Sequence, residues 1–311
     1  DGADLCLTLA HSENRYLEFL PEPKRIDTVS YGFELFAGEV KTDSGGYITE
    51  FHELAEAAQG SKHLAVLRMD VDNLGFVFSR GLRERSVPKV ANLSRMLDWF
   101  FSGYLNSLVA GRNLYTTYAG GDDLFIVGAW NEVLELARNI RADFKGFCAA
   151  NPDLHISGGI SLCKGKYPIA RAAEEAGEAL DEIAKGKRRF EGDSDKDSLA
   201  FLEQKVNWER LEELMGLGDR MIKAISEEKL SRKFVYQTLS LYRHHIDPNR
   251  RKHKKELTNR EDLVWLPRFL YILARNVKDK ELQLELQKQI CAHRRYIPVL
   301  AGYVSLTTRK S

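Results

Sequence analysis

Between residues 61 and 205, short apolar runs alternate with longer stretches in which apolar positions recur every three or four residues. A short apolar run bounded by turn residues is typical of a buried strand, whereas the longer repeat predicts an amphipathic helix. The predicted strands cover residues 63–72, 113–119, 124–129, 154–163 and 198–202, and the predicted helices cover 87–110, 131–150 and 168–186.

The predicted order from residue 63 to residue 186 is strand, helix, strand, strand, helix, strand, helix. This is the split βαβ order. It predicts an α+β fold with a ferredoxin-like βαββαβ palm domain of the nucleotidyl cyclase and polymerase type. In such a sheet the first and third strands are central neighbours, so we expect the end of the first strand beside the start of the third.

The regions on either side of residues 61–205 have different patterns. Residues 1–60 are mixed and turn-rich, with a predicted strand pair at 31–40 and a short helix at 49–60. Residues 206–311 are all-helical in pattern and predict a helical bundle. Its helices are expected at 208–229, 232–246, 260–277 and 280–306. We therefore predict three parts: a linker (1–60), a palm domain (61–205) and a C-terminal helical domain (206–311).

Composition excludes several classes of protein. The 311 residues carry a net charge of +1, so no global charge drives binding to nucleic acid or membrane. No apolar run reaches the roughly 18 residues of a membrane span, so no membrane contact is expected. The four cysteines are far apart, which predicts neither a disulfide framework nor a zinc site and favours a cytoplasmic location.

Carboxylates cluster at the ends of the predicted strands. Asp70 and Asp72 end the first strand, and the turn "GGDD" places Asp122 and Asp123 directly before an apolar strand. Adjacent carboxylates repel each other, and an unpaired buried carboxylate is costly, so the pattern predicts a cation at this point. Extended residues alternate in direction, so one of the paired aspartates could instead cap the turn. Asp72 could be a second ligand or only the start of a turn.

Nucleotidyl transfer requires an arrangement of this kind. Two divalent cations, Mg²⁺ or Mn²⁺, bridge the attacking and leaving oxygens of a nucleoside triphosphate. Magnesium takes one or two carboxylates and leaves room for phosphate oxygens. Gly120 and Gly121 would let the backbone approach a nucleotide, and Asn73 and Gly75 would lie close to its phosphates.

Five segments together resemble a known family: "HLAVLRMDVDNLG", "YAGGDDLFIVG", "LHISGGISL", "AEEAGEALDEIAKG" and "KDSLAFLEQKVNWERLEEL". They are similar to the large subunit of type III CRISPR-Cas effector complexes of the Csm type. The likeness covers the predicted palm in order and continues into the helical region. Residues 1–60 resemble the linker between that subunit's two palm domains.

The resemblance implies a cyclic oligoadenylate synthetase. Such a subunit joins ATP through 3′-5′ bonds when target RNA is bound, and the products switch on nucleases. Its metal ligands would be Asp70, Asp122 and Asp123. Lys185 would contact the triphosphate, and Ser157 would face the base. By plain chemistry, Lys185 could equally pair with a helix dipole and Ser157 could bond locally. The implied partners are other complex subunits, guide RNA and target RNA.

The sequence also departs from the family. It has no His-Asp dipeptide of an HD nuclease, no paired cysteines and a single palm pattern. We therefore expect the C-terminal part of a longer subunit, or a split subunit, that binds one ATP and turns over poorly alone. One rival hypothesis is a diguanylate-cyclase-like GTP enzyme, although Leu124 stands where those enzymes usually have Phe. A second rival is a non-catalytic scaffold that binds RNA and protein.

Overall fold

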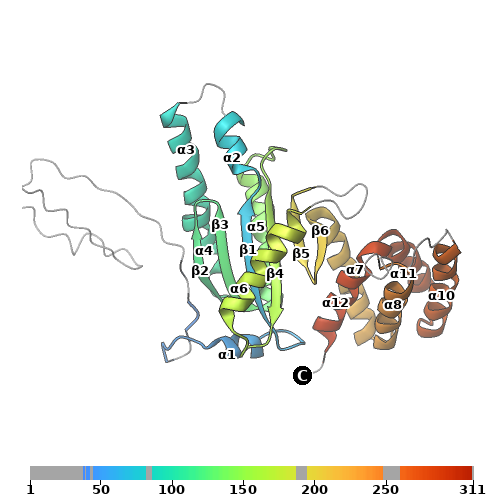
Figure 1. Cartoon of the computed structure of the whole chain (residues 1–311). Coiled ribbons are helices and arrows are strands. Elements are labelled where there is room, and N and C mark those ends of the chain that lie inside the picture. Colours follow the sequence, from blue (N-terminus) through green and yellow to red (C-terminus); the bar gives the residue numbers. More distant parts are fainter. Residues whose placement is uncertain are drawn as a thin grey trace, which may run out of the picture. The chain divides into compact units, whose positions relative to one another are not determined.

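Six strands form one sheet in the computed structural model of the chain (Figure 1). Their order across the sheet is β2-β3-β1-β4-β5-β6. The strands are β1 (Leu64–Val71), β2 (Leu114–Gly120), β3 (Asp123–Ala129), β4 (Ile156–Cys163), β5 (Ser198–Phe201) and β6 (Gln204–Asn207). All neighbouring pairs are antiparallel except β4 and β5, which are parallel.

The structure describes residues 38, 40–42, 45–81, 86–186, 195–247 and 260–309, without the side chains of 260–263. All of these lie in one compact unit, within residues 35–311. The strand pair predicted at 31–40 falls almost wholly outside the described residues. None of the described helices combines the length and apolar character needed to cross a membrane.

The predicted α+β palm followed by helices is confirmed. β1 lies between β3 and β4, as the βαββαβ order requires. Its apolar run is buried on both faces, which is why residues 64–67 read as a continuous apolar segment rather than an alternating one.

Helices cover both faces of the sheet. One face packs on α5 (Trp130–Phe147) and on the segment formed by α3 (Val87–Asp98), a π-helical turn (η2, Trp99–Tyr104) and α4 (Leu105–Val109). The other face packs on α1 (Phe51–Glu56) and α6 (Ile169–Glu178), which continues into a second π-helical segment (η3, Ala179–Ala184). Two short pieces follow β1: α2 (Leu74–Phe76) and a π-helical turn (η1, Val77–Gly81).

The α6–η3 segment lies unusually close to the sheet because β4 has a glycine beneath it. A Cβ atom on Gly159 would lie 2.4 Å from the Leu180 nitrogen and 2.5 Å from the Ala176 carbonyl oxygen. The helix backbone therefore rests on the strand at this point. This contact determines where the C-terminal end of η3, and hence Lys185, comes to lie.

The C-terminal helices continue from the sheet without a break in the core. They are α7 (Trp208–Ser226), α8 (Arg232–His245), α10 (Arg260–Asn276), α11 (Lys280–Ala292) and α12 (Ile297–Thr308), with a 3₁₀ turn (η4, Arg294–Tyr296) before α12. The indole N–H of Trp208 donates to the Ile156 carbonyl at 2.8 Å and ties α7 to β4. Side chains of the sheet and of these helices belong to one buried apolar cluster.

One predicted helix boundary was wrong, and one strand was not predicted. Residues 280–306 were expected as one helix, but the helix ends at Ala292 and a new one starts at Ile297. Pro298 has no N–H with which to continue the helix from the preceding turn. Strand β6 was not predicted, because the turn before it, Leu202 and Glu203, lacks the glycine or asparagine typical of such turns. Both residues have positive φ (53° and 61°).

Replacing Gly159 with alanine should destabilise the fold by about 2–3 kcal/mol, because the new methyl group would collide with helix backbone that cannot move freely. Urea unfolding followed by circular dichroism measures this change. Gly146→Ala is the matched control: its Cβ meets nothing within 4 Å, so stability should be unchanged or higher by up to about 1 kcal/mol. Equal effects of both substitutions would contradict the close contact.

His293, at the end of α11, should give the fold an acid-sensitive component. Its side chain is buried, Arg210 Nη1 donates to its Nδ1 at 3.2 Å, and burial together with Arg210 lowers its pKa. As pH falls through 6.5, the unfolded chain takes up a proton that the folded chain resists, so stability is lost. The stability difference between wild type and His293→Asn should therefore shrink between pH 8 and pH 5.

Urea unfolding at several pH values measures that difference. His244→Asn is the control, because His244 is exposed on α8. A difference between wild type and His293→Asn that stays constant across this pH range would refute the assignment.

Candidate active site

Asp70 and Asp123 lie directly opposite each other on the two central strands of the palm. Antiparallel pairing of β1 with β3 makes them register partners. Opposed residues of such a pair have Cα atoms roughly 4.5–5.5 Å apart and side chains on the same face. The strands therefore bring together two carboxylates that are 53 residues apart in sequence (123 − 70).

The GGDD turn sets this register. Gly120 pairs with Asp123, so the loop between β2 and β3 consists of Gly121 and Asp122 alone. Gly121 has φ +67°, while Asp122 is not among the residues with positive φ. This is the pattern of a type II′ turn, which takes glycine at its first central position. Gly121 is thus required by the turn itself, whatever approaches it.

Each opposed carboxylate has a cationic neighbour. Lys185, which follows η3, forms an ion pair with Asp70 Oδ2. Arg68 lies two residues before Asp70 on the same face of β1, and its Nη2 is 3.4 Å from Asp123 Oδ2. These cations offset the repulsion between two opposed carboxylates.

Burial changes the proton affinities of this group. Burial raises the pKa of Asp123, and Asp122 acts in the same direction, while Arg68 opposes them. Burial and the nearby charge of Lys196 lower the pKa of Lys185 to about 8, whereas contact with the Asp70 carboxylate favours its charged form. Asp123 Oδ1 is buried and has no hydrogen-bond partner among the described residues. This oxygen is available to a ligand.

A second, buried network supports the strand ends. Asp72 Oδ2 accepts a hydrogen bond from Ser157 Oγ at 2.7 Å and another from the Asp197 backbone N–H at 3.0 Å. The carboxylate of Asp197 in turn binds Arg141 of α5 through two hydrogen bonds, at 2.7 and 2.8 Å. Burial raises the pKa of Asp72, and the hydrogen bonds that Asp72 accepts from the Asp197 N–H and from Ser157 oppose that rise. The network joins β1, β4, α5 and the residues before β5.

This geometry corrects two predicted nucleotide contacts. The side chains of Asp72 and Ser157 are both 0% exposed, so neither presents a surface to a nucleotide. Ser157 does occupy the predicted strand, opposite Asp70, but its hydroxyl bonds to Asp72. The alternative of a locally bonded strand hydroxyl is not what the structure shows either, because Asp72 lies 85 residues away in sequence.

The other predicted residues lie at the open end of the strands. Asn73 is exposed, has φ 58°, and accepts a hydrogen bond from Lys196 Nζ at 2.7 Å. A Cβ atom on Gly75 or Gly121 would meet nothing within 4 Å, and one on Gly120 would make only ordinary contacts. Asp122 is half-buried on the turn, and its carbonyl accepts the Val71 N–H at 3.1 Å.

The carboxylates at this site supply only part of the coordination shell of a magnesium ion. Among the described residues, no three His, Cys, Asp or Glu side chains converge into a metal-binding group. The predicted set of Asp70, Asp122 and Asp123 is thus not assembled as a three-carboxylate cage. Magnesium commonly takes one or two carboxylates and completes its shell with water and substrate phosphates. The opposed pair Asp70 and Asp123, with the free oxygen of Asp123, fits that mode.

Sequence reasoning missed three charged residues at this site. Arg68 was detectable as a single charge inside an apolar strand. Lys196 and Asp197 lie in the stretch 186–197, which reads as a solvated loop. The side chain of Asp197 is nevertheless only 19% exposed. No local signal showed that this part of the chain returns to the end of β1.

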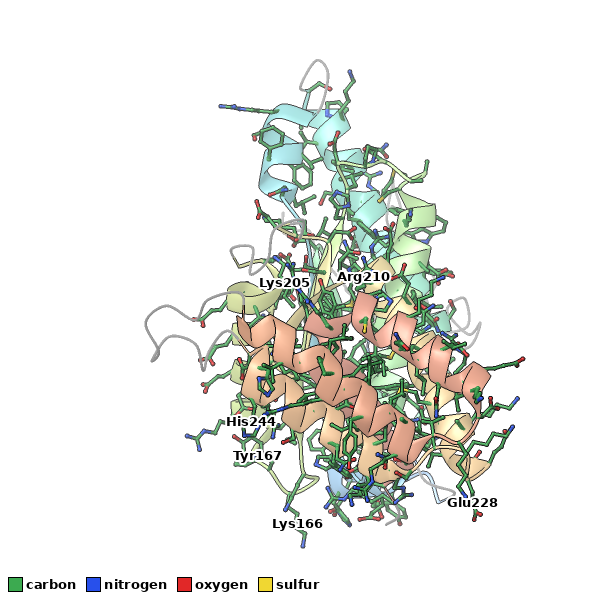
Figure 2. All side chains as sticks on the ribbon, turned by 90° about the vertical axis from the view of Figure 1, so that its right-hand side faces the viewer. Lys166, Tyr167, Lys205, Arg210, Glu228 and His244 are labelled. Carbon is green, nitrogen blue, oxygen red and sulfur yellow. The ribbon has the colours of Figure 1, made fainter. Side chains whose placement is uncertain are left out.

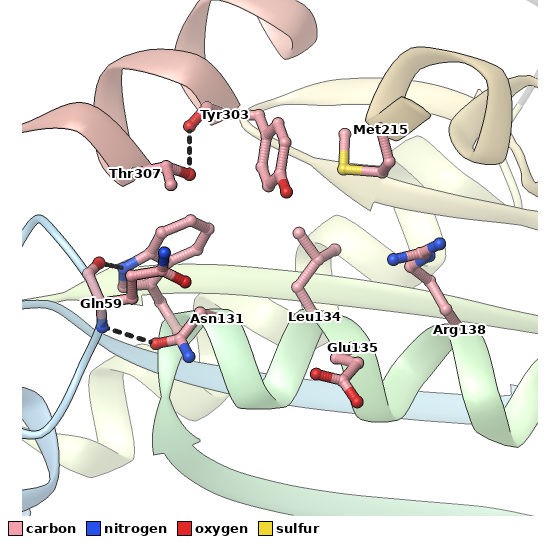
Figure 3. A pocket seen from close by; sticks show the side chains of 9 residues that line it. Gln59, Asn131, Leu134, Glu135, Arg138, Met215, Tyr303 and Thr307 are labelled. Atoms are coloured by element: carbon pink, nitrogen blue, oxygen red, sulfur yellow. Dashed lines mark hydrogen bonds between the residues drawn. The ribbon is translucent and has the colours of Figure 1, made fainter. Parts of the chain in front are cut away.

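A small pocket lies elsewhere, between α5 and the helices α7 and α12 (Figure 3). Its volume is about 110 Å³, well below the roughly 300 Å³ of typical ligand sites. The indole N–H of Trp130 donates to the Gln59 carbonyl at 3.0 Å, and Asn131 Oδ1 accepts the Gln59 N–H at 2.9 Å. None of the predicted site residues lines this pocket.

Known proteins that are similar to this chain contain a palm domain of the same kind. Residues 63–200 match the family model of the second palm domain of Cas10/Cmr2. The chain is similar to the CRISPR system single-strand-specific deoxyribonuclease Cas10/Csm1 (subtype III-A) of Enterococcus italicus. The two are 34% identical over 229 residues, which cover 72% of this chain and 27% of the relative. The chain thus spans about a quarter of the length of that curated relative.

Solved structures share the fold. A Csm1–Csm4 cassette in complex with cA3 superimposes with a TM-score of 0.66 at 23% identity, covering 89% of this chain and 40% of that one. A Csm1–Csm4 cassette in complex with AMPPNP gives a TM-score of 0.67 at 24% identity, with the same coverage.

Breaking the buried ion pair of Asp197 should cost more than breaking a matched surface pair. Arg141–Asp197 and Arg138–Glu212 are both ion pairs with two hydrogen bonds, and both arginines lie on α5. The side chains of the first pair are 12% and 19% exposed. Those of the second pair are 31% and 52% exposed. Asn also tolerates the φ of 57° at residue 197. Asp197→Asn should therefore lower the unfolding free energy by about 2 kcal/mol, and Glu212→Gln by less than about 1.

Urea unfolding of both variants checks this prediction. Equal losses would show that the Asp72–Asp197–Arg141 network does not anchor the strand ends.

Proposed function

The chain belongs to the Cas10/Csm1 family of type III CRISPR systems, and on this premise we propose that its palm joins ATP molecules into oligoadenylates. The reaction is a metal-dependent nucleotidyl transfer, and its end products are cyclic oligoadenylates. The observation that carries the proposal is the opposed pair Asp70 and Asp123, flanked by Lys185 and Arg68. Complexes of Csm1–Csm4 cassettes with cA3 and with AMPPNP support the assignment of adenine nucleotides.

Asp70 and Asp123 would hold the divalent cation, with Asp122 on the adjoining turn as the next carboxylate. When bound, two such ions lower the pKa of an attacking 3′-hydroxyl and stabilise the pyrophosphate leaving group. The exposed Asn73 and Gly75 lie next to Asp70 in sequence and leave open space for phosphates. The II′ turn keeps Asp122 and Asp123 in a fixed position before substrate arrives.

Lys185 would change partners during binding. Without nucleotide, its ammonium neutralises Asp70. A triphosphate at the carboxylates offers stronger acceptors, and Lys185 and Lys196 would then neutralise its negative charge. Arg68 stays with Asp123 and compensates the second carboxylate. In this proposal the 3′-hydroxyl oxygen forms a bond to the α-phosphorus, the bond to pyrophosphate breaks, and the hydroxyl proton leaves to solvent or to a substrate phosphate.

The described residues form one palm sheet, so in this proposal a second nucleotide is held by another palm. We propose that a second palm domain and other complex subunits complete the synthetase, and that guide and target RNA act through that complex.

Metal-dependent ATP binding tests the proposal. Calorimetric titration of ATP with Mg²⁺ or Mn²⁺ should show binding in wild type that EDTA abolishes. Asp70→Asn and Asp123→Asn should each weaken binding by at least about tenfold, because each removes a charged ligand. Asp181→Asn is the matched control: it removes one carboxylate from an exposed position of η3 and should bind ATP like wild type.

Other outcomes of the titration would change the assignment. Preferential binding of GTP would favour the cyclase-like enzyme over the oligoadenylate synthetase. No binding of either nucleotide would refute a nucleotide site formed by this chain and favour the scaffold hypothesis.

A further inference from the structure

Strand β6 contains a buried lysine that the proposed mechanism does not use. Lys205 is 6% exposed and lies within the body of the molecule, whereas Lys166 extends away from it (Figure 2). Its Nζ donates to the carbonyl of Gly186 at 2.9 Å and to the carbonyl of Asp195 at 2.7 Å. A buried ammonium is costly unless it is compensated by acceptors. These two carbonyls supply such acceptors, and Gly186 lies just past η3, where a helix presents partial negative charge.

The two carbonyls belong to residues that are adjacent in sequence to Lys185 and Lys196, the two lysines at the site. Gly186 directly follows Lys185, which pairs with Asp70. Asp195 directly precedes Lys196, which donates to Asn73 Oδ1. One buried side chain therefore binds the backbone next to both lysines.

The backbone on the other side of each lysine is also held by a hydrogen bond. Ser198 Oγ donates to the Ala184 carbonyl at 2.8 Å, immediately before Lys185. The N–H of Asp197, immediately after Lys196, donates to Asp72 at 3.0 Å. Lys185 and Lys196 thus lie between backbone positions that β1, β5 and β6 hold in place.

The hairpin that carries Lys205 is itself anchored. Leu202 and Glu203, at its tip, both have positive φ, a conformation that is unfavourable for residues other than glycine. Such strain persists where the surroundings hold it. A Cβ atom on Gly302 of α12 would lie 2.2 Å from Leu202 Cδ1, so Leu202 packs into the space that this glycine leaves. The C-terminal helix therefore steadies the hairpin.

We propose that Lys205 is a positioning residue that sets the ammonium groups of Lys185 and Lys196 beside the carboxylate pair to receive the triphosphate. The inference rests on the proposed function, because it assigns the two lysines to the phosphates of ATP. Lys205 itself would not touch the nucleotide.

Two measurements on the whole chain test the positioning. Hydrogen exchange should become faster in peptides covering 184–186 and 195–198 when Lys205 is replaced by Met. ATP affinity, measured with Mn²⁺, should fall about tenfold in Lys205→Met, while AMP affinity changes less than about twofold. Lys205→Arg keeps the charge and the donors and should restore most of the affinity.

The chain offers a matched control. Lys62 Nζ also donates to two backbone carbonyls, those of Glu56 at 2.6 Å and Ala58 at 3.1 Å, outside the site. Lys62→Met should leave ATP affinity within about twofold of wild type, because it removes the same kind of bond without moving Lys185 or Lys196. If Lys205→Met does not fold, Lys205→Gln serves in its place: it keeps a donor but is one bond too short for both carbonyls.

A double-mutant cycle separates positioning from a general loss of structure. In a Lys185→Met background, Lys205→Met should reduce ATP affinity less than it does in wild type, because part of its effect passes through Lys185. Equal reductions in both backgrounds would overturn the inference, as would unchanged exchange in Lys205→Met. A wild-type chain that binds no ATP overturns the proposed function and this inference together. ATP binding that is equal in wild type and Lys205→Met overturns the inference alone.

Discussion

The structure depends on the antiparallel pairing that places Asp70 opposite Asp123 at the centre of the sheet. Two carboxylates in this position repel each other, and nearby cations reduce the cost of that repulsion. Arg68 and Lys185 supply that compensation from two different elements. Two opposed carboxylates, each paired with a cation, are the feature on which the proposed nucleotide site rests.

The packing around the sheet places Lys185 beside Asp70. Gly159 lets α6 and η3 rest on the sheet, and the end of η3 is then held by side chains of β5 and β6. The hydrogen bonds among Asp72, Ser157 and Asp197 join the end of β1 to β4 and to the residues before β5. Residues without exposed surface therefore shape the site as much as those that face it.

The helices after the palm are part of the same framework. Trp208 bonds to β4, and the tip of the β5–β6 hairpin packs against α12. The described residues thus contain one palm sheet together with helices that share its buried core.

Most of the order of strands and helices could be predicted from the sequence, β6 and the break between α11 and α12 excepted, since apolar runs and helical repeats depend only on local spacing. The sequence also made Asp70, Asp122 and Asp123 the candidate site residues, because charges at the ends of apolar strands are conspicuous. The burial of Asp72 and Ser157, and the contacts of Arg68, Asp197 and Lys205 near the strand ends, could not be predicted from the sequence. These contacts join residues such as Asp72 and Asp197, 125 positions apart, and no local pattern records such a pairing.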